Sequence, residues 1–126
     1  MKPPIKWNAD LFGVEIQTED EHFVIEASPS KIMTWFEAVR YYTDPHHIPT
    51  WQLPAMKQMQ IVAKYIDEVN DLIKENGGYE LRGLFWTADE IDEFCAWFVG
   101  TGNGDAILSV KNFKLCVCAV SDLKVK

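Results

Sequence analysis

The sequence predicts an α+β domain in which strands near both ends of the chain flank two central helices. Short runs of β-branched and aromatic residues lie in the N-terminal third, and two amphipathic helical segments follow in the middle. The last third contains strand-like runs separated by Gly- and Asn-containing turns. With 126 residues the chain is long enough to bury one hydrophobic core, so we expect a single domain over residues 1–126.

The first two predicted strands cover residues 11–17 and 22–27. Both runs are rich in β-branched and aromatic side chains, and the acidic segment 18–21 separates them. Runs of this kind around a short polar turn are typical of a hairpin or of paired strands.

The first helix is predicted at about residues 35–43. Thr34 and Glu37 have the spacing of a capping box, in which each side chain bonds a backbone N–H of the first turn. Apolar residues then recur at helical spacing along one face, beginning at Trp35. Pro45 ends the helix, because the residue before a proline resists helical dihedral angles.

The second helix is predicted over about residues 55–76, followed by a glycine stop at Gly77-Gly78. Its apolar face is formed by Met59, Val62, Ile66, Val69 and Ile73. In the stretch before it, we expect Trp51 and Leu53 to enter the core between the first helix and the sheet. Pro54 would occupy the first turn of the second helix, where its missing N–H costs little.

The segment 88–98 is compatible with two interpretations. Thr87 and Glu90 have capping-box spacing, and apolar residues follow at helical positions, which favours a helix. The aromatic and β-branched run "FCAWFVG" instead favours a strand that ends at the turn "GTGNGD". We prefer a meander of strands that continues through "AILSV" and "FKLCVCAV".

Composition and charge exclude several classes of function. The net charge of −7 carries no basic cluster, so we expect no nucleic-acid partner. No apolar run approaches the length of a membrane span, so no membrane insertion is expected. No signal peptide is visible, which favours a cytoplasmic protein, with an extracellular or phage-associated location if the chain is a fragment or a phage component. An odd count of three cysteines does not suggest a disulfide framework.

Five short stretches together resemble a bacterial C-type-lectin-like family with a Trp-Arg-Leu-Pro-Thr-like motif. They are, in order, "TWFEAVRYY", "TWQLPAMKQM", "FWTADE", "AWFV" and "CVCAV". Thr50, Gln52 and Ala55 depart from the Gly, Arg and Thr of the family motif. The resemblance implies two helices packed on twisted antiparallel sheets, with the N- and C-terminal strands paired. Its relatives include lectins, receptor-binding proteins and the formylglycine-generating oxidase.

We expect a non-enzymatic binding or recognition module whose ligand is a protein or a glycan. Loops on a rigid scaffold are common binding sites, and aromatic faces stack on sugars or anchor protein partners. The candidate ligand-binding residues, all between positions 86 and 105, are Trp86, Thr87, Asp89, Glu90, Trp97, Thr101, Asn103 and Asp105. The sequence leaves the ligand and the oligomeric state open.

Two alternatives remain from other classes of function. Cys116 and Cys118 stand two positions apart, on one face of a predicted strand, which would suit a copper- or thiol-dependent oxidoreductase. Buried cysteines in a core are the simpler interpretation. The other alternative is a structural or assembly subunit whose exposed aromatic residues form an oligomer contact. We expect no metal and no cofactor: the acidic run 89–93 suits a solvated turn, and His46-His47 suits a polar loop.

Overall fold

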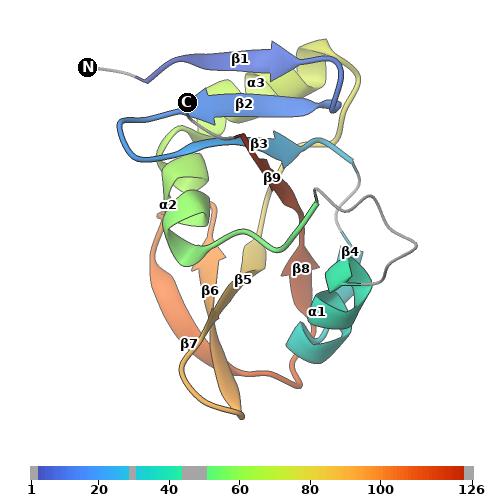
Figure 1. Ribbon diagram of the computed structural model, residues 1–126, viewed down its shortest axis with the longest axis vertical. Helices are drawn as coiled ribbons and strands as arrows, with labels where there is room; N and C mark the ends of the chain where they lie inside the picture. The colour runs from blue at the N-terminus through green and yellow to red at the C-terminus, as the bar shows by residue number, and fades with distance from the viewer. Residues whose placement is uncertain (1–2, 29–30, 44–50, 124–126) are drawn as a thin grey trace.

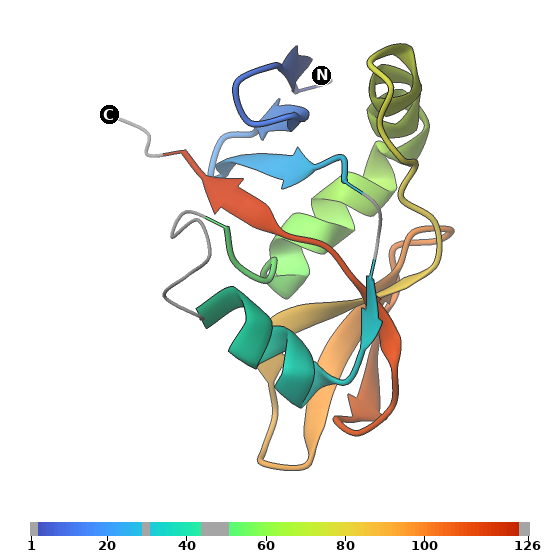
Figure 2. The ribbon, with the colours of Figure 1, turned by 90° about the vertical axis from the view of Figure 1, so that its right-hand side faces the viewer.

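The computed structural model describes residues 3–28, 31–43 and 51–123 and confirms the α+β class. Within these ranges the chain forms three helices and two β-sheets, and the helices lie on both sides of the second sheet (Figures 1 and 2). The same ranges contain no helix that is both long and apolar enough to cross a membrane.

The first sheet joins strands from both ends of the chain in the order β1-β2-β3-β9. The strands are β1 (Ile5–Asn8), β2 (Gly13–Gln17), β3 (His22–Glu26) and β9 (Val120–Asp122), and all neighbours are antiparallel. The predicted hairpin is confirmed as β2 and β3, whereas β1 was not predicted. The pairing of β3 with β9 brings the two ends of the chain together.

The second sheet has the order β4-β8-β5-β6-β7 (Figure 1). Its strands are β4 (Lys31–Met33), β5 (Leu84–Glu90), β6 (Cys95–Gly100), β7 (Ala106–Val110) and β8 (Leu115–Val117). The preferred strand meander is therefore confirmed, and the helical alternative for 88–98 is wrong. Cross-strand packing of the aromatic and β-branched residues outweighs the helical spacing in this segment.

Helix α1 (Trp35–Thr43) begins and ends within the predicted range. Its capping box is also confirmed: the Thr34 N–H donates to Glu37 Oε1 at 2.9 Å, and the Glu37 N–H donates to Thr34 Oγ1 at 3.1 Å. These bonds satisfy N–H groups that the first helical turn leaves without backbone partners.

The predicted second helix is divided into α2 (Met56–Lys64) and α3 (Ile66–Glu75). Tyr65 separates them with φ −113° and ψ 28°, outside helical values, and Figure 2 shows the two helices running in different directions. The change of direction lets α2 pack against β5 and β6 while α3 packs against β1 and β2. The predicted glycine stop is present, since Gly77 has φ 79°.

Pro54 does not occupy the first helical turn, which corrects the prediction. Ala55 is the N-cap of α2, and its N–H donates to Gln58 Oε1 at 2.9 Å. Pro54 therefore lies before the cap, where its carbonyl accepts the Ala88 N–H at 2.8 Å. This bond fixes the start of α2 to strand β5.

Two apolar clusters lie on opposite faces of the second sheet. The larger cluster packs this sheet and the first sheet against α2 and α3, and the smaller one packs under α1. Phe85 and Trp86 are consecutive in β5 and belong to different clusters, because side chains alternate between the faces of a strand. Leu53 is 7% exposed and enters the cluster under α1 as predicted, whereas Trp51 is half-buried and belongs to neither buried set.

Candidate functional site

The predicted site residues in β5 are part of the core. Trp86 is fully buried, and its Nε1–H donates to the Met33 carbonyl at 3.2 Å. Thr87 is also fully buried, and its hydroxyl donates to the Trp97 carbonyl at 2.9 Å. These side chains join β5 to β4 and β6, so a ligand on the surface does not reach them.

Three further predicted residues support turns or a helix end. Asp89 Oδ1 accepts the N–H of Met56 at 3.2 Å, at the positive N-terminus of α2. Thr101 is 5% exposed and its hydroxyl accepts the Gly83 N–H at 3.0 Å. Asn103 Oδ1 accepts the Asp105 N–H at 3.0 Å, which closes the turn between β6 and β7.

The predicted residues do not form one site, because strand β6 separates them. Glu90 lies at one end of β6, next to the β5–β6 turn, whereas Thr101, Asn103 and Asp105 lie at the other end. Six residues of strand extend over about 20 Å, at roughly 3.3 Å per residue. Trp97 lies between these ends, half-buried and paired with Leu108.

The end of the molecule that carries the β5–β6 turn gathers large exposed apolar side chains. We call this surface the aromatic end. It comprises Phe36 (52% exposed), Ile91 (56%), Phe94 (68%), Val110 (43%) and Phe113 (60%). A groove of about 270 Å³ runs between α1, the β5–β6 turn and the β7–β8 turn, and its lining includes Phe36, Phe94 and Val110. Of these residues, only Ile91 and Phe94 belong to a pattern visible in the sequence, the helical spacing within residues 88–98.

A buried lysine forms the floor of this groove. Lys111 is 2% exposed, and its ammonium group contacts the carboxylate of Glu90. The ammonium also lies 4.2 Å from the centroid of the Trp35 ring, which is within the range of a cation–π interaction. The charge therefore has both an ionic and an aromatic partner.

The backbone of Lys111 connects the three segments of the aromatic end. Its N–H donates to the Phe94 carbonyl at 2.8 Å, and its carbonyl accepts the Trp35 N–H at 3.0 Å. The β5–β6 turn, strand β7 and the start of α1 are thus held by one residue. An apolar surface fixed in this way is preorganised for binding, which lowers the entropy cost of contact.

A second hollow, of about 250 Å³, is lined by residues that include Trp35 and Glu90. Tyr42 and Leu53 contribute to its wall. Burial, together with the Glu26 carboxylate, raises the pKa of Tyr42 well above its usual value. The Tyr42 hydroxyl is therefore a neutral donor, and it bonds Glu26 Oε1 at 3.3 Å.

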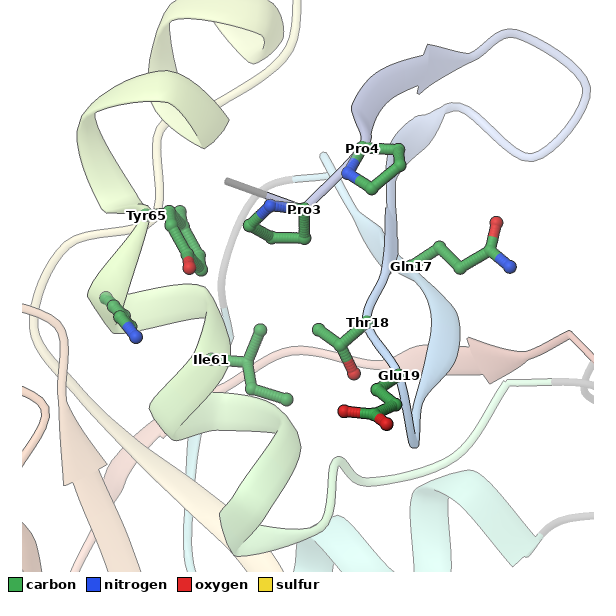
Figure 3. Close-up of a pocket in the computed structure, with 8 residues that line it drawn as sticks. Pro3, Pro4, Gln17, Thr18, Glu19, Ile61 and Tyr65 are labelled. Atoms are coloured by element: carbon green, nitrogen blue, oxygen red, sulfur yellow. The ribbon is translucent and has the colours of Figure 1, made fainter. Parts of the chain in front are cut away.

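A third hollow, of about 710 Å³, lies between α2 and the β2–β3 turn. Figure 3 shows Ile61 of α2 and Tyr65, the residue after α2, facing Pro3 and Thr18 across it. The sequence did not indicate it, because its walls come from three separate segments. Thr18 Oγ1 already accepts the Glu21 N–H at 3.0 Å, so this hydroxyl serves the turn. The lining of this open groove mixes the apolar residues Pro3, Pro4 and Ile61 with polar ones that include Gln17, Glu19 and Lys64.

Of the three cysteines, Cys118 is buried in the core, whereas Cys95 and Cys116 are partly exposed. Burial raises the pKa of both Cys116 and Cys118, so both are protonated thiols near neutral pH. The Cys118 thiol contacts Met59 Sδ at 3.8 Å. Cys95 is the first residue of β6. Among the residues that the structure describes, no three His, Cys, Asp or Glu side chains are placed to hold a metal ion. His46 and His47 lie outside the described residues.

Two comparisons with known proteins identify no relative of this chain. A scan against protein-family models finds no matching family, and a search of curated proteins finds no matching sequence. The function must therefore be argued from the geometry and chemistry of the surface itself.

Proposed function

We propose that this protein is a non-enzymatic recognition module with a C-type-lectin-like fold, and that the aromatic end binds a protein ligand. The order of elements supports this fold: a strand pair, a short helix, longer helical segments and a strand meander. The pairing of β3 with β9, which joins the two ends of the chain, supports it as well.

The observation that carries the proposal is the concentration of exposed apolar side chains at the aromatic end. Single exposed apolar residues are ordinary, but a contiguous group around a groove marks an interaction surface. Here Phe36, Phe94 and Val110 line one groove, and each is more than 40% exposed.

The chemistry of the groove favours a protein over a glycan. Sugars are held by hydrogen bonds to polar side chains in addition to stacking, and the groove's charged group, Lys111, already has Glu90 as its partner. The rim is acidic, with Asp92 and Glu93 exposed in the β5–β6 turn. A complementary ligand is a peptide segment with large apolar side chains next to Lys or Arg.

The proposal is tested by selecting peptides from a random displayed library on the intact protein and measuring their affinities by calorimetry. We expect selected peptides to combine apolar and basic residues. Phe94→Ala should weaken their binding by at least tenfold, about 1.4 kcal/mol, without lowering the melting temperature. Tyr79→Ala is the matched control, because Tyr79 is 60% exposed and lies before β5, away from the groove.

Equal binding by the Phe94→Ala protein would place the ligand elsewhere and refute the aromatic end as the site. Selection of glycans rather than peptides, in a parallel glycan array, would refute the proposed ligand class.

A further inference from the structure

Strand β7 is the longest sheet edge that the described part of the chain leaves uncovered (Figure 1). It consists of Ala106, Ile107, Leu108, Ser109 and Val110, without a charged residue. Ile107 is 48% exposed, Leu108 40% and Val110 43%. Edge strands normally carry charges, prolines or bulges, or are covered, because a free edge invites another strand to pair with it.

The other sheet edges have such protection. Strand β1 carries Lys6, whose side chain is 70% exposed. Strand β4 has three residues and begins with Lys31. The outer edge of β9 is bridged by Gln52, which exchanges backbone bonds of 2.8 and 3.0 Å with Val120. Strand β7 is longer than these edge strands and has no charged residue.

Two backbone bonds determine which groups of β7 point outward. Gly100 N–H donates to the Asp105 carbonyl, and Lys111 N–H donates to the Phe94 carbonyl. Hydrogen-bonded and non-bonded pairs alternate along an antiparallel ladder, so Ile107 and Ser109 direct their backbone groups to β6. The backbone groups of Ala106, Leu108 and Val110 therefore point to the free edge.

We infer that β7 pairs antiparallel with β7 of a second copy, with Leu108 on the two-fold axis. In this register the two Leu108 residues exchange both backbone bonds, and each Val110 N–H meets the Ala106 carbonyl of the other copy. The Val110 carbonyl already accepts the Phe113 N–H at 3.2 Å, and the pairing does not depend on it. The outward backbone N–H and carbonyl groups of β7 therefore meet complementary groups of β7 in the second copy.

The side chains fit the same axis. Leu108 pairs with Trp97 across β6 and β7, so the two copies would place their Leu108 and Trp97 side chains in one apolar row. Val110 would lie beside Ala106 of the other copy, a large residue next to a small one. The acidic residue Asp105 would lie opposite the position of Lys111 rather than opposite its own copy, so no like charges meet. A second copy therefore supplies partners for the outward backbone groups of β7, and this interface shares only Val110 with the aromatic end.

Sedimentation velocity over protein concentrations from about 1 μM to about 1 mM tests the dimer, a range that covers micromolar dissociation constants. We expect a concentration-dependent dimer that Leu108→Lys weakens at least tenfold, because it places two like charges on the axis. Ile32→Lys is the control: Ile32 is 67% exposed on β4, the opposite edge of the same sheet, and its substitution should leave the dimer intact.

Amide exchange measured by NMR identifies the interface residue by residue. The N–H groups of Leu108 and Val110 should be protected at high concentration and exchange freely in the Leu108→Lys monomer or on dilution. The N–H groups of Ile107 and Ser109, which face β6, should be protected in every case and report that the hairpin is folded. A monomer at every concentration, or a dimer that survives Leu108→Lys with unprotected Val110, overturns the inference. Failure of peptide binding at Phe94 would leave this result unaffected.

Discussion

The ammonium group of Lys111 is almost fully removed from water, and its partners are the Glu90 carboxylate and the rings of Trp35 and Phe36. Glu90→Gln keeps the shape of the partner and removes its charge. A buried charge that loses its partner costs about 3–5 kcal/mol, but Glu90 is half exposed, so water can replace part of the interaction. We predict a loss of about 1–3 kcal/mol in the free energy of unfolding, measured by urea denaturation.

The control for this change is Glu93→Gln, an exposed carboxylate in the same turn, which should alter stability by less than about 0.5 kcal/mol. If the Glu90 and Glu93 variants were equally stable, the ion pair would have no energetic role at the aromatic end.

Glu26 is a carboxyl group whose burial raises its pKa. The nearby Lys31, the Tyr42 hydroxyl and a backbone bond oppose the rise, and the Cys118 thiol lies close by. Because the folded pKa exceeds the unfolded value near 4.5, the folded state binds the proton more tightly. The resulting stabilisation is complete below the unfolded pKa and is lost as the pH rises through the folded pKa.

Glu26→Gln should therefore increase stability at pH 7, where the natural side chain is a partly desolvated anion. The increase should disappear at about pH 3, where both proteins are neutral at this position. Urea unfolding of both proteins at these two pH values checks the sign. A gain of the same size at both pH values would show that the charge is not its cause.

At the scale of the elements, the close approach of β2 and β3 depends on Gly13. A Cβ atom at Gly13 would lie 2.4 Å from the Ile25 carbonyl oxygen and 2.7 Å from Val24 Cγ1. The backbone oxygen cannot move without breaking the strand pairing, so Gly13→Ala should cost about 3 kcal/mol. Gly102→Ala is the matched control, because a Cβ there meets no atom within 4 Å.

Urea denaturation of the two glycine variants measures the difference directly. The Gly102→Ala protein should lie within about 0.5 kcal/mol of the natural one. A Gly13→Ala protein of natural stability would mean that β2 moves away from β3 at little cost.

The elements that the sequence predicted correctly carry strong local signals. The capping box of Thr34 and Glu37 and the glycine at 77 are short-range devices, and both function as predicted. The division at Tyr65 has no such signal, because the apolar spacing continues from α2 into α3. It follows from packing, since the two halves cover different sheets.

The candidate site was predicted less well for a related reason. Trp86 and Thr87 were placed on a binding loop, but they lie in a strand covered on both faces, which a sequence run cannot distinguish from an exposed turn. Phe36 and Phe94 are 58 positions apart in the sequence, so their meeting in one groove depends on how α1 packs on the sheet. Trp51 and Leu53 were both expected to enter the core, and of the two only Leu53 is buried in it.

At the scale of the whole molecule, the second sheet lies between two apolar clusters. Strands β5, β6 and β8 contribute side chains to both clusters. Phe85, Val99 and Cys116 lie against the larger cluster, while Trp86, Phe98 and Val117 belong to the smaller one. Loss of either cluster would remove one cover of the same strands and expose their apolar residues. The two clusters should therefore unfold together, as small domains of this size usually do.

We predict a single unfolding transition, with no intermediate in which α1 alone has separated. Tryptophan fluorescence reports strongly on the cluster under α1, which contains Trp35 and Trp86, whereas far-UV circular dichroism reports on all the helices and strands. The two urea-unfolding curves should coincide in midpoint and slope. An earlier fluorescence midpoint would mean that α1 and its cluster form a separate unit of stability. In that case the aromatic end, which α1 shares through Phe36, would open before the rest of the fold and would not be the rigid surface that the contacts of Lys111 imply.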